Sequence, residues 1–235
     1  MGASGRLGRL IVTAVVGAPD MVLSAALTHE KSGAIGEQIL GSHLTVCPLS
    51  EEALEGVDII IDASLPNGLA ALLDLGGCVP IVSGTTGGGQ TLISKIETAT
   101  KSRPILHTAN FTAGVTLLTR LAVMAAAALP DYEVVLSETH HIHKKDAPSG
   151  TALLLADAIG ATRKAQNEQF PIESHRQGEV VGEHTVSLVG ATERIELGHV
   201  AMDRAAFAVG ALRAARYLMG KPPGRYTMSD VLGLD

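Results

Sequence analysis

Residues Glu138 to Thr151 read ETHHIHKKDAPSGT, and the rest of the chain is organised around this stretch. Three of the nine histidines lie within four positions, at His140, His141 and His143. Histidine titrates near neutral pH, and the ammonium of the following Lys144 is a compact proton donor. Ser149 is a good N-cap for the apolar helical run after it, and N–H groups at a helix start bind anions. The stretch therefore predicts proton donors beside a carboxylate site.

Each of these features also has an ordinary structural explanation. A single histidine usually packs, a His/Lys cluster is often a solvated loop, and helices often begin with Pro-Ser-Gly-Thr. Together, in this order, they favour a functional site. A metal hydrolase that uses His141, His143 and Asp146 is a rival interpretation. It gives the Pro-Ser-Gly-Thr segment no role, and metal sites need geometry as well as ligand types, so we expect no metal.

Composition narrows the class of protein. The 235 residues are 46% apolar and 18% charged, which indicates a globular chain of one or two domains with an aliphatic core, since aromatics are only 3%. The net charge of −6 argues against a nucleic-acid partner. Cys47 and Cys78 are expected to be buried free thiols in a reducing compartment. The chain contains neither a membrane-length apolar run nor a signal-peptide pattern, so we expect a cytoplasmic enzyme that binds a small molecule and no membrane.

The chain opens on a glycine turn, MGASGRLG, with glycines at positions 2, 5 and 8. Such a turn before a helix, here expected over 9–16, lets the backbone approach a pyrophosphate. This nucleotide-binding pattern normally follows a central strand. We therefore expect a strand upstream of Met1, and an intact mass of the natural protein that begins at Met1 or Gly2 would contradict this.

Strands and helices alternate through residue 114, which predicts a doubly wound parallel sheet. The expected strands are 21–27, 44–46, 57–61, 79–82 and 104–107, and the expected helices are 50–56, 70–75 and 90–102. A small polar turn, 83–87, follows one strand at the sheet edge where ligands bind.

The second half predicts an open sheet with helices on one face. The expected helices are 115–129, 151–162 and 204–218, the strands are 132–137, 179–181, 184–189 and 194–199, and 163–174 is expected to be a loop.

The stretch from Glu138 to Ala152 closely resembles the signature of the 4-hydroxy-tetrahydrodipicolinate reductase (dihydrodipicolinate reductase) family, Glu-x-His-His-x-x-Lys-x-Asp-x-Pro-Ser-Gly-Thr-Ala. Every fixed position matches. The resemblance extends over essentially the whole chain, through segments 2–8, 62–66, 84–87, 108–111, 182–185 and 207–211. The last two look structural or oligomeric.

The resemblance implies NAD(P)H-dependent reduction of 4-hydroxy-tetrahydrodipicolinate to tetrahydrodipicolinate, with loss of water, in the diaminopimelate and lysine pathway. It implies an α/β fold whose domains we expect at 1–110 (dinucleotide-binding), 111–210 (substrate-binding and oligomerisation) and 211–235 (a C-terminal return). Family members are typically homotetramers that pair their open sheets, which would account for an apolar, uncovered sheet face.

The resemblance also assigns site residues. It implies that His140 and Lys144 are the acid/base pair, with Lys144 the proton donor and Lys145 facing solvent. His141 would bind one substrate carboxylate. Backbone N–H groups would bind the other, and they belong to Ser149, Gly150 and Thr151. The expected cofactor contacts are Gly2, Ala3, Ser4, Gly5, Arg6, Leu7, Thr28, His29, Gly84, Thr85, Thr86, Thr108, Ala109, Asn110 and Phe111.

The chain departs from the family pattern in three places. The first strand is absent. Thr28 occupies the position of the usual acidic residue, and His29 beside it could face a 2′-phosphate, which favours NADPH or the use of both NADPH and NADH. The segment before His175 is short and lacks the usual Arg-x-Gly-x-Arg element. A truncated, non-catalytic relative that binds dicarboxylates but no nucleotide is therefore an alternative, as is a related dehydrogenase with another substrate.

Overall fold

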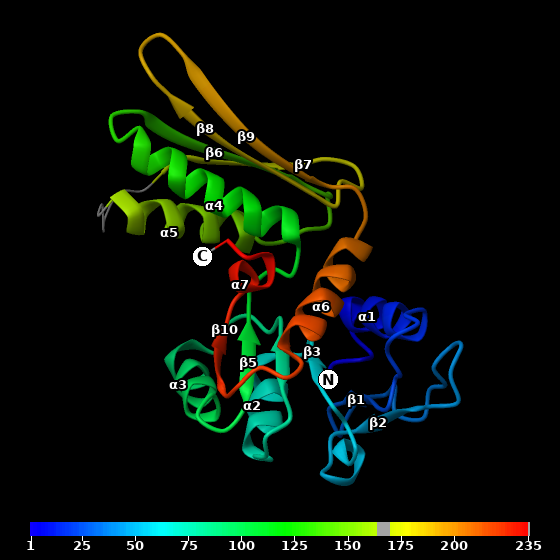
Figure 1. Ribbon diagram of the computed structural model, residues 1–235. Helices are drawn as coiled ribbons and strands as arrows, with labels where there is room; N and C mark the ends of the chain where they lie inside the picture. Colours follow the sequence, from blue (N-terminus) through cyan, green and yellow to red (C-terminus); the bar gives the residue numbers. More distant parts are fainter. Residues whose placement is uncertain (164–169, 235) are drawn as a thin grey trace. The chain divides into compact units, whose positions relative to one another are not determined.

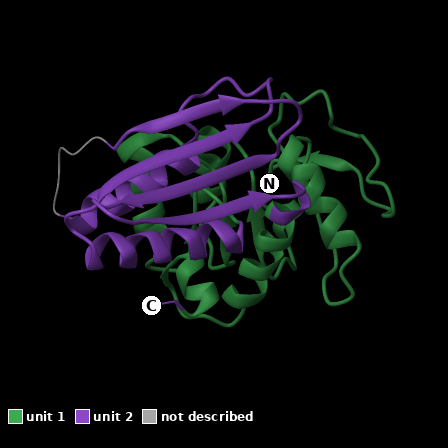
Figure 2. Ribbon diagram, turned by 90° about the horizontal axis from the view of Figure 1, so that it is seen from above, with its two compact units in different colours: residues 1–111, 207–233, 235 green, residues 112–206, 234 purple. Residues whose placement is uncertain are grey.

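A computed structural model describes residues 1–163 and 170–234, and it divides them into two compact units. The first unit comprises Met1–Phe111 and Phe207–Gly233, and the second comprises Thr112–Ala206 with Leu234 (Figure 2). The chain therefore changes unit after residues 111 and 206, against the expected boundaries at 110 and 210. Helix α6 (Ala205–Leu218) accounts for the second difference, because from Phe207 onwards it packs in the first unit.

The first unit contains a parallel four-stranded sheet in the order β10-β5-β4-β3, which confirms the predicted parallel α/β arrangement (Figure 1). A separate parallel pair, β1-β2, lies beside it. The elements in chain order are α1 (Arg6–Val16), β1 (Ala26–Thr28), β2 (Val46–Pro48), a 3-10 turn (Glu52–Leu54), β3 (Ile60–Asp62), α2 (Pro66–Asp74), β4 (Ile81–Ser83), α3 (Gly89–Ala99), β5 (Pro104–His107), α6, β10 (Gly224–Tyr226) and α7 (Met228–Leu232).

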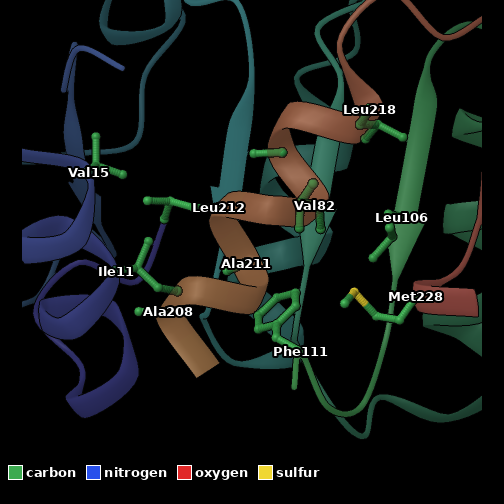
Figure 3. Packing of buried hydrophobic residues seen from close by; sticks show 12 residues of the cluster. Ile11, Val15, Val82, Leu106, Phe111, Ala208, Ala211, Leu212, Leu218 and Met228 are labelled. Atoms are coloured by element: carbon green, nitrogen blue, oxygen red, sulfur yellow. The ribbon is translucent and has the colours of Figure 1, made fainter. Parts of the chain in front are cut away.

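The core of this unit is aliphatic and surrounds α6 (Figure 3). Leu212 of α6 lies near Ile11 of α1, while Val82 of β4 packs in the same cluster. Helix α6 also packs closely against Phe111, and this contact depends on Gly210, because a Cβ at position 210 would lie 1.9 Å from the carbonyl oxygen of Phe111. The predicted aliphatic core is thus confirmed, and small residues of α6 allow the helix to pack tightly.

A cavity of about 470 Å³ separates β1 from β3. It is lined on its two sides by residues 21–27 and 57–61, and α1 and α6 also contribute lining residues. At one end Met1–Ala3 bridges the two strands, since Ala3 N donates to Leu27 O and Ala63 N donates to Met1 O, both at 3.0 Å. Residues 21–25 have no strand to pair with across this gap, which explains why only Ala26 and Leu27 of the expected strand 21–27 belong to β1, which ends at Thr28.

The second unit is a mixed sheet in the order β7-β6-β8-β9, with α4 and α5 along one face (Figure 1). The predicted open sheet with one helix-covered face is confirmed. Its elements are α4 (Ala113–Ala128), β6 (Glu133–His140), α5 (Gly150–Arg163), β7 (Ile172–Arg176), β8 (Gly182–Val189) and β9 (Arg194–Ala201). Side chains alternate along β6 and β8, so Leu136 and Val186 lie under the helices in the core. The opposite face is mainly polar, with Val135 and Val189 among Ser137, Thr139, Glu183, Thr185 and Ser187. The expectation of an apolar open face was therefore wrong.

Several other local expectations were also wrong. Residues 172–174 belong to β7 rather than to a loop, and residues 179–181 form no strand, whereas 164–169 lie outside the described residues. The expected helix 50–56 is only a single 3-10 turn. Both cysteines are free, but Cys47 is half-buried and Cys78 is exposed in the α2–β4 loop. These segments are short or glycine-flanked, and their structure follows from neighbours that a local pattern does not contain.

Candidate functional site

Strand β6 carries the first half of the signature onto the helix-covered face of the second unit. Glu138 and His140 are 1% and 8% exposed, so they are buried polar residues at the end of an otherwise apolar face. The register pairs Glu138 with His184 of β8, and His184 with His199 of β9. Three imidazoles therefore lie in a row across the sheet, with ring centroids 5.2 Å apart for His140–His184 and 6.2 Å apart for His184–His199.

Glu138 accepts hydrogen bonds from two partners, Arg176 and His140. Arg176, on the neighbouring strand β7, donates from Nη1 and Nη2 to Oε1 at 3.0 Å each. Nδ1 of His140 hydrogen-bonds to the other oxygen, Oε2. Burial alone would raise the pKa of Glu138, but the Ser174 hydroxyl, His140 and Arg176 together outweigh burial and lower it. Glu138 is therefore a carboxylate that fixes the ring of His140.

His140 is held as a neutral imidazole. Burial lowers its pKa, and the hydrogen bond to Glu138 opposes this only in part. Because a carboxylate can only accept, the proton on neutral His140 sits on Nδ1, and Nε2 carries the free lone pair. Nε2 is thus prepared to take a proton and, once charged, to return it.

Lys144 lies in the loop after β6, where its Nζ donates to both oxygens of Asp146 at 2.9 and 2.8 Å. This hydrogen bond lowers the pKa of Asp146. The Lys144 side chain is 20% exposed, and its charge helps to lower the pKa of His140. Lys145 is exposed, as expected. The loop thus presents a half-buried ammonium group whose charge acts on His140.

The start of α5 forms the other side of this site. Ser149 is buried, and its Oγ accepts the backbone N–H of Ala152 at 3.2 Å. This bond confirms the helix N-cap predicted for Ser149, and the backbone N–H of Ser149 stays the predicted carboxylate contact. Gly150 and Thr151 follow in the first helical turn, where the helix dipole favours an anion. His141 is half-buried in the loop, with its ring centroid 6.2 Å from that of His143.

The first unit contains the expected nucleotide loop at the start of α1. Gly2 has a φ of +80°, and a Cβ on Gly8 would lie 1.9 Å from the Gly2 carbonyl oxygen. The loop is therefore packed so closely on α1 that only glycine fits there. Ser4 Oγ lies 3.0 Å from the Thr28 hydroxyl, so Thr28 bonds to the loop from its buried position at the end of β1. The neighbouring His29 is exposed.

Asp62 organises the turns at the carboxyl ends of β3 and β4. Its fully buried carboxylate accepts the Ser83 and Thr85 hydroxyls at 2.7 Å and the Ser64 hydroxyl at 2.5 Å. The Thr85 hydroxyl also donates to Ser64 O at 2.9 Å. Thr85 thus has its hydroxyl engaged within the protein, while the next residue, Thr86, is exposed.

The remaining expected contacts lie in the same unit. Thr108 Oγ1 donates to Asn110 O at 2.8 Å, which shapes the turn that also contains Ala109. Phe111 is buried against Gly84, where a Cβ would lie 2.4 Å from the ring. Gly5, Arg6 and Leu7 continue the loop into α1.

Sequence reasoning gave no role to four residues that the structure places at the heart of these networks: Asp62, Glu138, Arg176 and His184. Asp62 and Glu138 are themselves the acidic residues of two matched segments, 62–66 and 138–152, which is a signal that a search for buried carboxylates could have used. Arg176 and His184 are remote in sequence from their partners, and only the strand register reveals them.

Comparisons with known proteins now identify the family. The N-terminal domain model of dihydrodipicolinate reductase matches residues 1–111, and the C-terminal domain model matches residues 114–232. The chain belongs to the dihydrodipicolinate reductase family. A reductase of Thiobacillus denitrificans named 4-hydroxy-tetrahydrodipicolinate reductase is 37% identical, over 99% of this chain and 97% of the relative. One of Xanthomonas campestris pv. campestris with the same name is 40% identical, over 98% and 95%.

A solved structure shows the same architecture. Dipicolinate-bound dihydrodipicolinate reductase from Paenisporosarcina sp. TG-14 aligns with a TM-score of 0.77 and 25% identity, over 96% of this chain and 95% of that one. The chain is accordingly an oxidoreductase with a Rossmann-like NAD(P)-binding unit. None of these comparisons favours the non-catalytic alternative. Within residues 1–163 and 170–234, no helix is long and apolar enough to cross a membrane, and no group of three or more His, Cys, Asp or Glu residues could hold a metal.

The buried His184 predicts an acid-sensitive fold. Burial lowers its pKa from 6.5 to about 4, so His184 binds its proton less readily in the folded than in the unfolded state. The stability that neutral His184 contributes is fully present above 6.5, the pKa of histidine in the unfolded chain. It is lost as the pH falls from 6.5 through 4. Between pH 7.5 and pH 5 the free energy of unfolding should fall by about 2 kcal/mol from this cause. Urea unfolding at the two pH values should show the loss in the wild type and a smaller loss in His184→Phe. An equal loss in both proteins would exclude His184 as the cause.

Proposed function

We propose that this chain reduces 4-hydroxy-tetrahydrodipicolinate to tetrahydrodipicolinate, with loss of water, on the route to diaminopimelate and lysine. The proposal is carried by one observation: a neutral, carboxylate-held His140 and the ammonium of Lys144 lie together in the unit that also contains the Ser149–Thr151 helix start. A proton donor and a proton acceptor near an anion site suit a substrate that has two carboxylates and needs a proton after reduction. The dipicolinate named in the related structure is a dicarboxylate of this kind.

In the proposed reaction, Lys144 Nζ delivers the proton to the ring carbon of the enamine that reduction leaves. His140 takes up or returns a proton at Nε2, which the Glu138 bond leaves free. The half-buried His141 binds one substrate carboxylate, and the N–H groups of Ser149, Gly150 and Thr151 bind the other. Proton transfer by such a positioned group contributes about 10²–10⁴-fold to a rate.

The first unit fits a dinucleotide. A loop that leaves no room for a Cβ at Gly8 and places the N–H groups of α1 at its end suits a pyrophosphate. When bound, the reduced nicotinamide supplies the hydride. Gly2–Leu7 would hold the phosphates, and the turns at Gly84–Thr86 and Thr108–Phe111 would face the nicotinamide end.

We also propose that NADPH is preferred over NADH, with use of both. Thr28 offers no carboxylate for a ribose 2′-hydroxyl and is engaged with Ser4, while the neighbouring His29 is exposed and its imidazole could bind a 2′-phosphate. A homotetramer, paired through the open sheet of the second unit, and a cytoplasmic location complete the proposal.

An oxidation assay tests the function directly. Pyruvate and aspartate semialdehyde, joined by the preceding synthase, would form the substrate in situ, and NADPH or NADH absorbance would be followed. We expect loss of absorbance that depends on the synthase and is faster with NADPH. Omission of the synthase is the control. A folded protein that binds NADPH in calorimetry yet shows no synthase-dependent turnover would exclude this reaction, and one that binds dipicolinate but no nucleotide would support the non-catalytic alternative.

A further inference from the structure

His184 is a buried residue of the second unit to which the proposed reaction gives no role. It lies on β8, is only 4% exposed, and faces the same side of the sheet as Glu138 and His140. A small residue next to it makes room for this arrangement, because a Cβ on Gly182 would lie 3.1 Å from His140 Nε2 and 3.7 Å from the His184 ring.

His184 contacts both halves of the proposed site. Its Nε2 lies 3.3 Å from Ser149 Oγ, the hydroxyl that caps α5. Its ring also meets the His140 ring edge-on, with an interplanar angle of 76°. Because Ser149 Oγ already accepts the Ala152 N–H, the bond to His184 fixes the remaining orientation of the hydroxyl.

The charged and titratable groups that act on His184 come from three elements. Glu138 and His140 lie on β6, Lys144 lies in the following loop, and His199 lies on β9. The pKa of His184 is lowered to about 4, mainly by burial and also by the neighbouring His140 and His199, while Glu138 opposes the shift. His184 is therefore neutral at neutral pH, and it bonds to Ser149 without adding a charge beside the acid/base pair.

We propose that His184 is a positioning residue for the substrate carboxylate site: its neutral imidazole holds Ser149, and with it the first turn of α5, in the orientation that receives the carboxylate. This role rests on the proposed function of the α5 start. It makes no contact with the reacting atoms, so its removal weakens dicarboxylate binding more than it slows proton transfer.

Three variants test the role. His184→Phe keeps the ring and removes the bond to Ser149, whereas His184→Gln restores a polar nitrogen near the position of Nε2. His175→Phe is the control, since His175 is an exposed histidine on β7 of the same sheet. We would measure the dipicolinate Kd by calorimetry, and kcat and KM in the coupled assay. One hydrogen bond lost should raise the dipicolinate Kd and the KM of His184→Phe about tenfold, with kcat within about threefold of wild type.

The glutamine variant should bind dipicolinate within about threefold of wild type, as should the control. A merely structural role would lower thermal stability without this split between KM and kcat, and without rescue by glutamine. Dipicolinate affinity in His184→Phe equal to wild type would overturn the inference, as would equal losses in the Phe and Gln variants. Wild-type protein that binds dipicolinate but shows no turnover in the coupled assay would contradict the proposed reaction. The positioning role would then be judged from the dipicolinate Kd values alone.

Discussion

Lys144→Ala should lower kcat by about 10²–10⁴-fold, the usual loss when a general acid is removed. The dipicolinate Kd should change little, because the proposed carboxylate sites belong to His141 and the start of α5. Stability should also change little, since the Asp146 side chain left behind is 59% exposed and can be solvated. Steady-state kinetics and calorimetry on the same preparation would separate these effects.

Lys145→Ala is the matched control, because it removes the same side chain one residue away from an exposed position. It should retain activity within about twofold of wild type. If Lys144→Ala keeps kcat within about threefold of wild type, Lys144 does not donate the proton. A comparable loss in both variants would point to the loop as a whole rather than to the Lys144 ammonium.

Gly8→Ala should abolish measurable NADPH binding and lower stability by about 1–3 kcal/mol, the usual cost of overpacking. The added methyl would lie 1.9 Å from Gly2 O and 3.0 Å from the Cα of Ala3, both backbone atoms that cannot rotate away. The nucleotide loop would have to move off the start of α1. Calorimetric titration with NADPH and urea unfolding would measure the two effects.

Gly33→Ala is the control for this substitution, because no atom lies within 4 Å of the methyl it would add. It should bind NADPH as the wild type does. Binding of NADPH by Gly8→Ala within about threefold of wild type would show that the close packing at Gly8 is not needed for the cofactor. Dipicolinate binding, a property proposed for the second unit, provides an independent check that Gly8→Ala is folded.

Local patterns were enough to predict most elements of the first unit. Strand β5 was expected at Pro104–His107 and forms there, because a continuous apolar run between turn residues is typical of a buried parallel strand. Strand β10 was missed, since Gly224–Tyr226 has no such run and becomes a strand only by pairing with β5. Short strands depend on their partners, and a partner more than a hundred residues away leaves no trace in the local pattern.

The features of the site also divide into those that the sequence indicated and those that only the tertiary structure revealed. The sequence by itself indicated the family, the acid/base candidates His140 and Lys144, and a candidate carboxylate site at Ser149–Thr151, because these residues lie in one contiguous stretch whose order carries the signal. Only the tertiary structure decided the protonation and the orientation of these side chains. Arg176 reaches Glu138 across 38 residues, and His184 reaches Ser149 across 35, through the register of β7 and β8 against β6. The physical reason is that hydrogen bonds and burial act over a few ångströms in space, so protonation and orientation depend on neighbours that strand pairing supplies.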